Sequence, residues 1–172
     1  ASGRNEGLVV MGRFFAYVKD TVLDHFNRRL RHLTPEQRGR LASKFASAYV
    51  KSAYKNGDLI EQTVKDEGFD CDYAREGWVQ GQDFGDEAEL DETVRLGIEA
   101  GFDDWGKIQP EEVLEKSGMP FETPAGYSKR TASWHPAKWV WSLLTTALKS
   151  DNIKMFTNTR VLHVEDQGEH YE

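Results

Sequence analysis

The chain has 172 residues, of which 38% are hydrophobic and 12% are aromatic. This is enough apolar material for one folding unit with its own core, so we do not expect a disordered chain. The formal net charge is −7, and we interpret it as spread along the chain without a block of Lys and Arg. This interpretation predicts no binding to nucleic acid or to an anionic membrane.

No run of apolar residues approaches the roughly 18 that a membrane helix needs, and the N-terminus lacks a secretory signal pattern. We therefore expect no membrane span. Cys71 is the single cysteine, so it cannot form a disulfide within the chain, which fits a cytoplasmic location. The chain opens in a loop-like stretch and stops in a β-like stretch, and we expect it to be an internal piece of a longer protein.

Two helices are predicted first. From residue 11 to residue 33, apolar residues recur at threes and fours, which is typical of an amphipathic helix. Thr34, Pro35 and Gln37 then supply an N-cap, a proline at the first helical position and the partner of a capping box. Gly68 is expected to end this second helix in a left-handed conformation. Its predicted buried stripe comprises Leu41, Phe45, Tyr49, Ala53, Ile60 and Val64.

Short elements follow in the middle of the chain. Residues 71–73 and 78–80 are predicted to form a β-hairpin around a turn at 75–77. Helices are expected over residues 85–101 and from Pro110 to Gly118, and residues 126–134 are expected to be extended.

His135 and Pro136 open a last predicted helix. We expect its broad apolar face to pack on a sheet or helix, and we assign Trp134, Trp139 and Trp141 to packing. Residues 153–156 and 161–164 are β-like. Together the elements predict an α+β fold that is mainly helical, with short antiparallel strands. The apolar face comprises Trp139, Leu143, Leu144 and Leu148.

The sequence has no nucleophile elbow, phosphate loop, complete G-x-G-x-x-G fingerprint or paired metal-ligand motif. The five histidines lie far apart, and a strand would place Cys71 on the opposite side from Asp70 and Asp72. We therefore predict no metal site. The catalytic residues stay unknown, because no residue is identified as an acid or base.

The stretch Ser2-Gly3-Arg4-Asn5-Glu6-Gly7 combines flexible glycines, small polar side chains and a guanidinium just before an apolar segment. Such a loop can present backbone N–H groups and a cation to a phosphate or to the edge of a flavin. A solvated terminal tail is the alternative, and the pattern alone does not favour either interpretation.

This loop resembles the S-G-R-N-G-G loop of flavin-dependent oxidoreductases of the D-amino-acid-oxidase-like superfamily, with Glu6 in place of a glycine. Gly77-Trp78-Val79-Gln80 is similar to a G-W-L-Q-like strand of the family's substrate domain. The helix after His135-Pro136 and the stretch Thr157-Asn158-Thr159-Arg160-Val161 resemble the family's helix, strand and T-x-V sequence. The resemblance covers almost the whole chain in the family's order.

The resemblance implies a fold of two domains, one binding FAD and one binding substrate. Residues 1–10 would be the flavin-side loop of the FAD-binding domain, 11–134 the helical and substrate-domain part, and 135–172 a helix and strands returning to the FAD-binding domain. Backbone of Val161 would meet the adenine end of FAD. The residues implied at the flavin are Ser2, Gly3, Arg4, Asn5 and Gly7.

In the family, the pyrophosphate-binding G-x-G-x-x-G unit precedes this loop, and further strands follow the T-x-V strand. The resemblance thus implies that the missing N- and C-terminal parts of the same protein are its partners. It also implies that the full protein oxidises a small amine or amino acid by hydride transfer to FAD, and that residues 1–172 alone are inactive. The alternative is a helical interaction or structural module without a cofactor.

Overall fold

The structure is a computed structural model that describes residues 3–9, 14–81 and 87–168. Helices form about half of the chain, and the described strands are short and antiparallel. The α+β prediction is therefore confirmed. The helices are α1 (Phe14–Arg29), α2 (Pro35–Glu67), α3 (Glu87–Glu99), α4 (Pro110–Ser117) and α5 (Pro136–Ala147).

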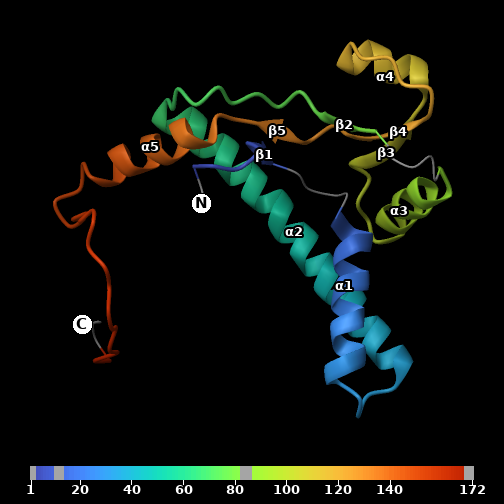
Figure 1. The fold of residues 1–172 in the computed structure, drawn as a ribbon, viewed down its shortest axis with the longest axis horizontal. Coiled ribbons are helices and arrows are strands. Elements are labelled where there is room, and N and C mark those ends of the chain that lie inside the picture. The colour runs from blue at the N-terminus through green and yellow to red at the C-terminus, as the bar shows by residue number, and fades with distance from the viewer. Residues whose placement is uncertain (1–2, 10–13, 82–86, 169–172) are drawn as a thin grey trace.

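The long helix α2 is the axis of the molecule, and α1 packs along its N-terminal half (Figure 1). The predicted capping box is present: the Gln37 N–H donates to Thr34 Oγ1 at 3.2 Å, and the Thr34 N–H donates to Gln37 Oε1 at 2.8 Å. Gly68 ends the helix in the left-handed region with φ 63°. Both ends of α2 thus lie where the sequence predicted them.

In the N-terminal half of α2 the buried face lies one position after the predicted stripe, whereas Ile60 is buried as predicted. Ala42, Ala46 and Val50 are fully buried, whereas Phe45 and Tyr49 are each 50% exposed. Ala46 and Val50 pack with Phe15 of α1. Small side chains on this face let α1 approach closely, and the larger aromatic side chains are left toward solvent.

The predicted hairpin is wrong. Strand β2 (Trp78–Gln80) pairs instead with β4 (Ala125–Ser128), which also pairs with β3 (Trp105–Ile108) in the order β2-β4-β3. Residues 71–73 form no strand, and Asp72 has a positive φ of 53° that breaks the extended backbone. Gly126 in the central strand leaves room for the ring of Trp105, which would lie 1.9 Å from a Cβ there.

A second, two-stranded sheet pairs β1 (Leu8–Val9) with β5 (Ala132–Ser133) beside α2. Val9, Ile60 and Ala132 form the buried cluster at this junction. Residues 126–134 are largely extended as predicted, but a turn separates β4 from β5. The buried carboxylate of Asp104 stabilises this turn. It accepts hydrogen bonds from Ser128 Oγ at 2.6 Å and from the Arg130 N–H at 2.8 Å.

The last part of the chain departs most from expectation. Trp139 of α5 stacks on Trp134 with ring centroids 5.2 Å apart, but Trp141 is 66% exposed, and Leu143 and Leu148 are exposed too. The packing predicted for these three side chains is therefore wrong. Residues 153–156 and 161–164 form no strand and are exposed, because none of the described strands lies beside them to pair with their backbone groups.

Candidate functional site

The glycine loop is joined to the segment that opens α5. The Trp134 N–H donates a hydrogen bond of 2.9 Å to the carbonyl oxygen of Gly7. The pairing continues in β1 and β5, where Leu8 faces Ser133. Within the loop, Asn5 Oδ1 accepts from the Gly7 N–H at 2.8 Å. Residues 3–7 thus form an ordered turn, which is held by an internal hydrogen bond and by contacts with neighbouring segments. This arrangement differs from a solvated terminal tail.

Gly7 is required by this turn for two reasons. Its φ of 72° lies in the left-handed region, which side chains other than glycine rarely adopt. A Cβ at Gly7 would also lie 2.2 Å from the carbonyl oxygen of Trp134. The glycine therefore allows the loop to approach the backbone before α5.

The other end of the loop reaches the first turn of α5. A Cβ on Gly3 would lie 3.6 Å from Cα of Ala137, so Gly3 is close to the helix backbone. The N-cap of α5 is His135, whose Nδ1 accepts from the Lys138 N–H at 3.3 Å. The loop therefore lies beside a helix N-terminus, where backbone N–H groups and the helix dipole favour negative charge.

A hollow of about 370 Å³ opens on the other side of β1, between that strand and α2. We call it the β1–α2 hollow. Its lining is mostly apolar with two polar side chains from α2, a composition typical of small-molecule sites. The lining residues are Leu8, Val9, Tyr49, Ser52, Ala53, Asn56, Ile60 and Trp134.

Trp134 connects the loop to the β1–α2 hollow. Its backbone holds Gly7, its ring stacks on Trp139, and its side chain lines the hollow. The indole Nε1 is buried and has no hydrogen-bond partner among the described residues. A buried N–H donor without a partner is unfavourable by roughly 1–3 kcal/mol, so this position favours an acceptor.

The remaining predicted site residues differ in where they lie. Ser2 lies outside the described residues, and the side chains of Arg4 and Glu6 are exposed at the loop. Val161 is 72% exposed in the segment after α5, which runs away from β1 in Figure 1. The structure brings Gly3, Arg4, Asn5 and Gly7 together but not Val161, whose contact with the adenine end stays a prediction.

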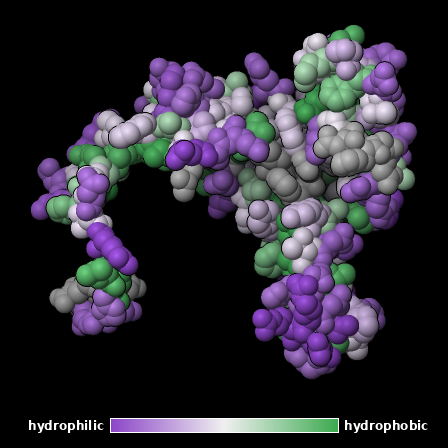
Figure 2. All heavy atoms as spheres, in the orientation of Figure 1, coloured by the Kyte–Doolittle hydropathy of each residue, from purple (hydrophilic) through white to green (hydrophobic). Residues whose placement is uncertain are grey.

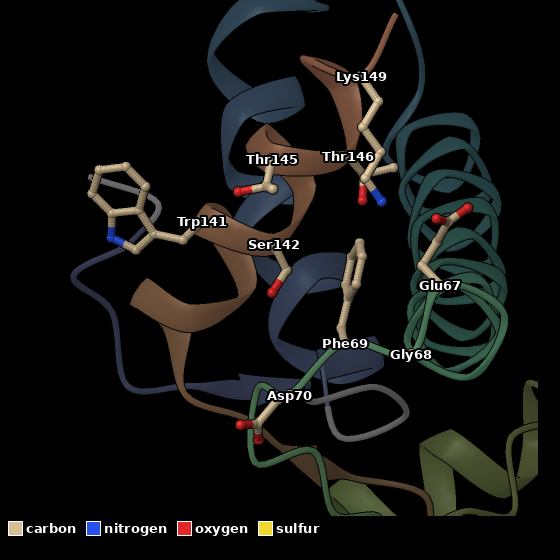
Figure 3. A pocket seen from close by; sticks show the side chains of 9 residues that line it. All are labelled: Glu67, Gly68, Phe69, Asp70, Trp141, Ser142, Thr145, Thr146 and Lys149. Atoms are coloured by element: carbon tan, nitrogen blue, oxygen red, sulfur yellow. The ribbon is translucent and has the colours of Figure 1, made fainter.

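Two further hollows contain residues that the sequence did not single out. One, of about 280 Å³, lies between the C-terminal end of α2 and the outer face of α5 (Figure 3). Hydroxyl groups of Ser142, Thr145 and Thr146 line it on the α5 side, and Glu67 lines it on the α2 side. Isolated Ser and Thr residues on a helix carry no sequence signal for such a groove.

The second, of about 310 Å³, is lined by Lys51, Tyr54, Asp58, Arg130 and the turn at Gly101–Phe102–Asp103. The Arg130 guanidinium lies 4.4 Å from the ring centroid of Tyr54 and donates to Asp58 at 3.0 Å. Burial, followed by the nearby charge of Asp104, raises the pKa of the Tyr54 hydroxyl, so it stays protonated. These residues lie up to 79 positions apart, so no local pattern could group them.

The comparison with known families decides the identity of the chain. The family model described as FAD dependent oxidoreductase (DAO) matches residues 1–172, the whole chain. The chain belongs to the FAD-dependent oxidoreductase family. Its cofactor is therefore FAD, as the loop resemblance implied. No curated protein matches the chain.

The residues of this FAD-dependent oxidoreductase fit one end of FAD. The loop offers an exposed guanidinium at Arg4, its Gly3 lies beside the first turn of α5, and Trp134 lines the largely apolar hollow. The hollow is too small for a whole dinucleotide, and the sequence contains no G-x-G-x-x-G turn for the pyrophosphate. In the described part of the chain, no helix is long and apolar enough to cross a membrane.

Proposed function

We propose that the full protein oxidises a small amine or amino acid, with the loop at residues 2–7 lying against the flavin of FAD. The observation that carries this proposal is the junction of Gly7 and Trp134, which fixes the loop beside both a helix N-terminus and an apolar hollow. Family membership supports the oxidoreductase activity and speaks against the alternative of a helical module without cofactor.

When bound, FAD would supply the hydride acceptor for oxidation of the C–H bond beside the amine nitrogen. The chain's own residues have other tasks. Arg4 would stabilise negative charge at the flavin edge, and Asn5 would hold the Gly7 turn through its hydrogen bond to the Gly7 N–H. The apolar lining of the β1–α2 hollow would exclude water from the ring.

The test of the loop is the flavin content of the purified full protein. Arg4→Ala is expected to lower the ratio of FAD to protein and to shift the flavin absorption spectrum. Arg29→Ala is the matched control, because Arg29 is an exposed arginine at the far end of α1. Unchanged flavin content and spectrum in Arg4→Ala would show that the loop does not contact FAD.

The substrate class is tested by anaerobic mixing of the FAD-loaded protein with primary amines, secondary amines and amino acids. Bleaching of the oxidised flavin absorbance by one of these classes is expected. Reduction only by substrates without an amine, such as 2-hydroxy acids, would refute the proposed substrate class while leaving FAD binding untouched.

We further propose that residues 1–172 alone neither retain FAD nor oxidise substrate. Ordering flexible backbone opposes binding by roughly 1–2 kcal/mol per residue, and this piece offers contacts to one end of the ligand only. Titration of FAD into the isolated piece, followed by flavin fluorescence, is expected to show no saturation. Saturable binding in the micromolar range would mean that the site is more local than proposed.

A further inference from the structure

The charge of the chain is strongly segregated, contrary to our interpretation of an even spread. Residues 24–44 contain six Lys or Arg and two Asp or Glu, a net charge of +4 in a chain of net charge −7, which leaves −11 for the rest. These residues are the end of α1, the turn and the start of α2, which we call the hairpin tip. The tip projects away from the sheets and from α5 (Figure 1), and hydrophilic side chains cover it (Figure 2).

Only part of this basic charge is used within the hairpin. Arg38 donates to Asn27 Oδ1 at 2.8 Å and to the carbonyl oxygen of Leu33, so it holds the turn. Arg28 and Arg40 form ion pairs within their helices, with Asp24 and Glu36. Three exposed cations of the hairpin tip form no ion pair with the described residues: Arg29, Arg31 and Lys44.

The acidic remainder of the molecule does not cancel this field at the tip. Val50, where α2 meets the cluster next to α3, lies 16 residues after the cap Thr34, or about 24 Å along the helix axis. The Debye length at physiological salt is about 8 Å. A partner that touches the turn of the tip is therefore some three Debye lengths from the level of Val50, and it meets a positive surface. Lys44, six residues before Val50, lies about 9 Å from that level, roughly one Debye length.

We propose that the hairpin tip is a docking surface for the anionic headgroups of a lipid bilayer, to which the protein binds peripherally. Charge complementarity supports an anionic partner, and the apolar residues beside the cations favour a bilayer over a soluble polyanion. Leu41 and Phe45 are 42% and 50% exposed on α2, and helical spacing places both Lys44 and Phe45 beside Leu41. A bilayer interface takes up such side chains together with Lys and Arg, whereas a nucleic-acid duplex presents phosphates to the cations and has no apolar phase for the side chains.

The test is sedimentation of the FAD-loaded full protein with vesicles. The vesicles consist of phosphatidylcholine alone or of phosphatidylcholine with about a third of phosphatidylglycerol, at low and at high salt. Binding is expected only with the anionic vesicles and is expected to weaken steeply as salt rises. Equal binding to both vesicle types, or no binding to either at low salt, would overturn the proposal.

Two variants locate the surface. Each basic residue near an anionic bilayer contributes about fivefold in affinity, so Arg29→Ala/Arg31→Ala/Lys44→Ala is expected to lower partitioning on the order of 100-fold. The matched control, Lys129→Ala/Lys149→Ala/Lys154→Ala, removes the same charge from exposed sites elsewhere and is expected to have little effect. An equal loss of vesicle binding in both variants would show that binding depends on the net charge of the protein and not on the hairpin tip.

Phe45→Ser keeps every cation and is expected to lower partitioning roughly tenfold through the lost apolar contact. No loss in Phe45→Ser, together with tighter binding of an RNA duplex than of vesicles, would assign the tip to a soluble polyanion instead. The remaining possible partner is a second copy of the chain, which analytical ultracentrifugation at low salt would detect as a dimer. A dimer that becomes monomeric in the triple tip variant would assign the tip to the acidic surface of that second copy. Bound flavin, read from the absorption spectrum, should be unchanged in all variants and reports on folding.

Discussion

Trp134 holds Gly7 from two sides: its N–H donates to the Gly7 carbonyl oxygen at 2.9 Å, and its own carbonyl oxygen lies 2.2 Å from the place of a Cβ on Gly7. The glycine loop and the start of α5 are therefore one structural unit. Residues almost 130 positions apart in sequence meet here because β1 and β5 pair.

Gly7→Ala should disrupt this unit. The left-handed conformation alone disfavours alanine by roughly 1–2 kcal/mol, and the contact with Trp134 adds to this. We expect the free energy of unfolding to fall by at least about 2 kcal/mol in urea denaturation, with loss of bound FAD. Gly101→Ala is the control, because its φ is 86° but no atom lies within 4 Å of its Cβ position. Equal losses in the two variants would argue against the close approach.

Asp104→Ala should be among the most destabilising substitutions in the described chain. The substitution leaves the buried Ser128 hydroxyl and the Arg130 N–H without their acceptor. Each unsatisfied group is unfavourable by roughly 1–3 kcal/mol, so we expect a loss of about 3 kcal/mol. Asp103→Ala, at the exposed neighbouring position, should change stability by less than about 0.5 kcal/mol. The comparison is made by chemical denaturation, and similar values for both would contradict the role of the turn network.

Stability should depend on the ionisation of Asp58 in acid. Burial tends to raise the pKa of this carboxyl, but the hydrogen bonds and charges of Arg130 and Arg75 outweigh burial and hold the pKa below its usual 3.8. Since the unfolded chain takes up the proton first, the stabilisation is complete above about pH 4. It is lost as the pH falls through the lowered folded-state pKa.

Asp58→Asn is therefore expected to be less stable than the wild type at neutral pH. Between about pH 5 and about pH 2, which brackets the usual carboxyl pKa range, it should lose less stability than the wild type. Thermal melts across this range measure the slopes. Asp103→Asn should keep the wild-type slope, since its exposed carboxyl forms no ion pair within the described residues. If stability depended on pH with the same slope in the wild type and in Asp58→Asn, Asp58 would not contribute to the loss of stability in acid.

Cys71 should be unreactive in the folded protein. Its side chain is fully buried, and burial raises the pKa of the thiol, so the reactive thiolate is disfavoured. Labelling with a thiol reagent at pH 8 is expected to require opening of the structure and to be slower by a factor on the order of 1,000 than in denaturant. A cysteine placed at the exposed position of Ala48 in Cys71→Ser provides the fast reference. Rapid labelling of native Cys71 would contradict its burial.

The sequence by itself determined the ends of α2 and α4, because these signals are local. Thr34 and Gln37 form their capping box within one turn, and Gly118 ends α4 through its own left-handed φ of 69°. The family was also recognisable from the sequence, since the glycine loop and the later motifs follow the family's order.

Only the tertiary structure decided which partners these elements meet. The sequence favoured Phe45 and Tyr49 for the core of α2, yet close packing of α1 selected Ala46 and Val50. Likewise, β2 pairs with β4 rather than with the adjacent residues 71–73, because a strand's partner depends on register and on which edge is free in space. The same limit applies to the candidate site. Gly7 was predictable from the sequence as a loop glycine, but the contact of Trp134 with it depends on the pairing of β1 with β5, which are far apart in the sequence.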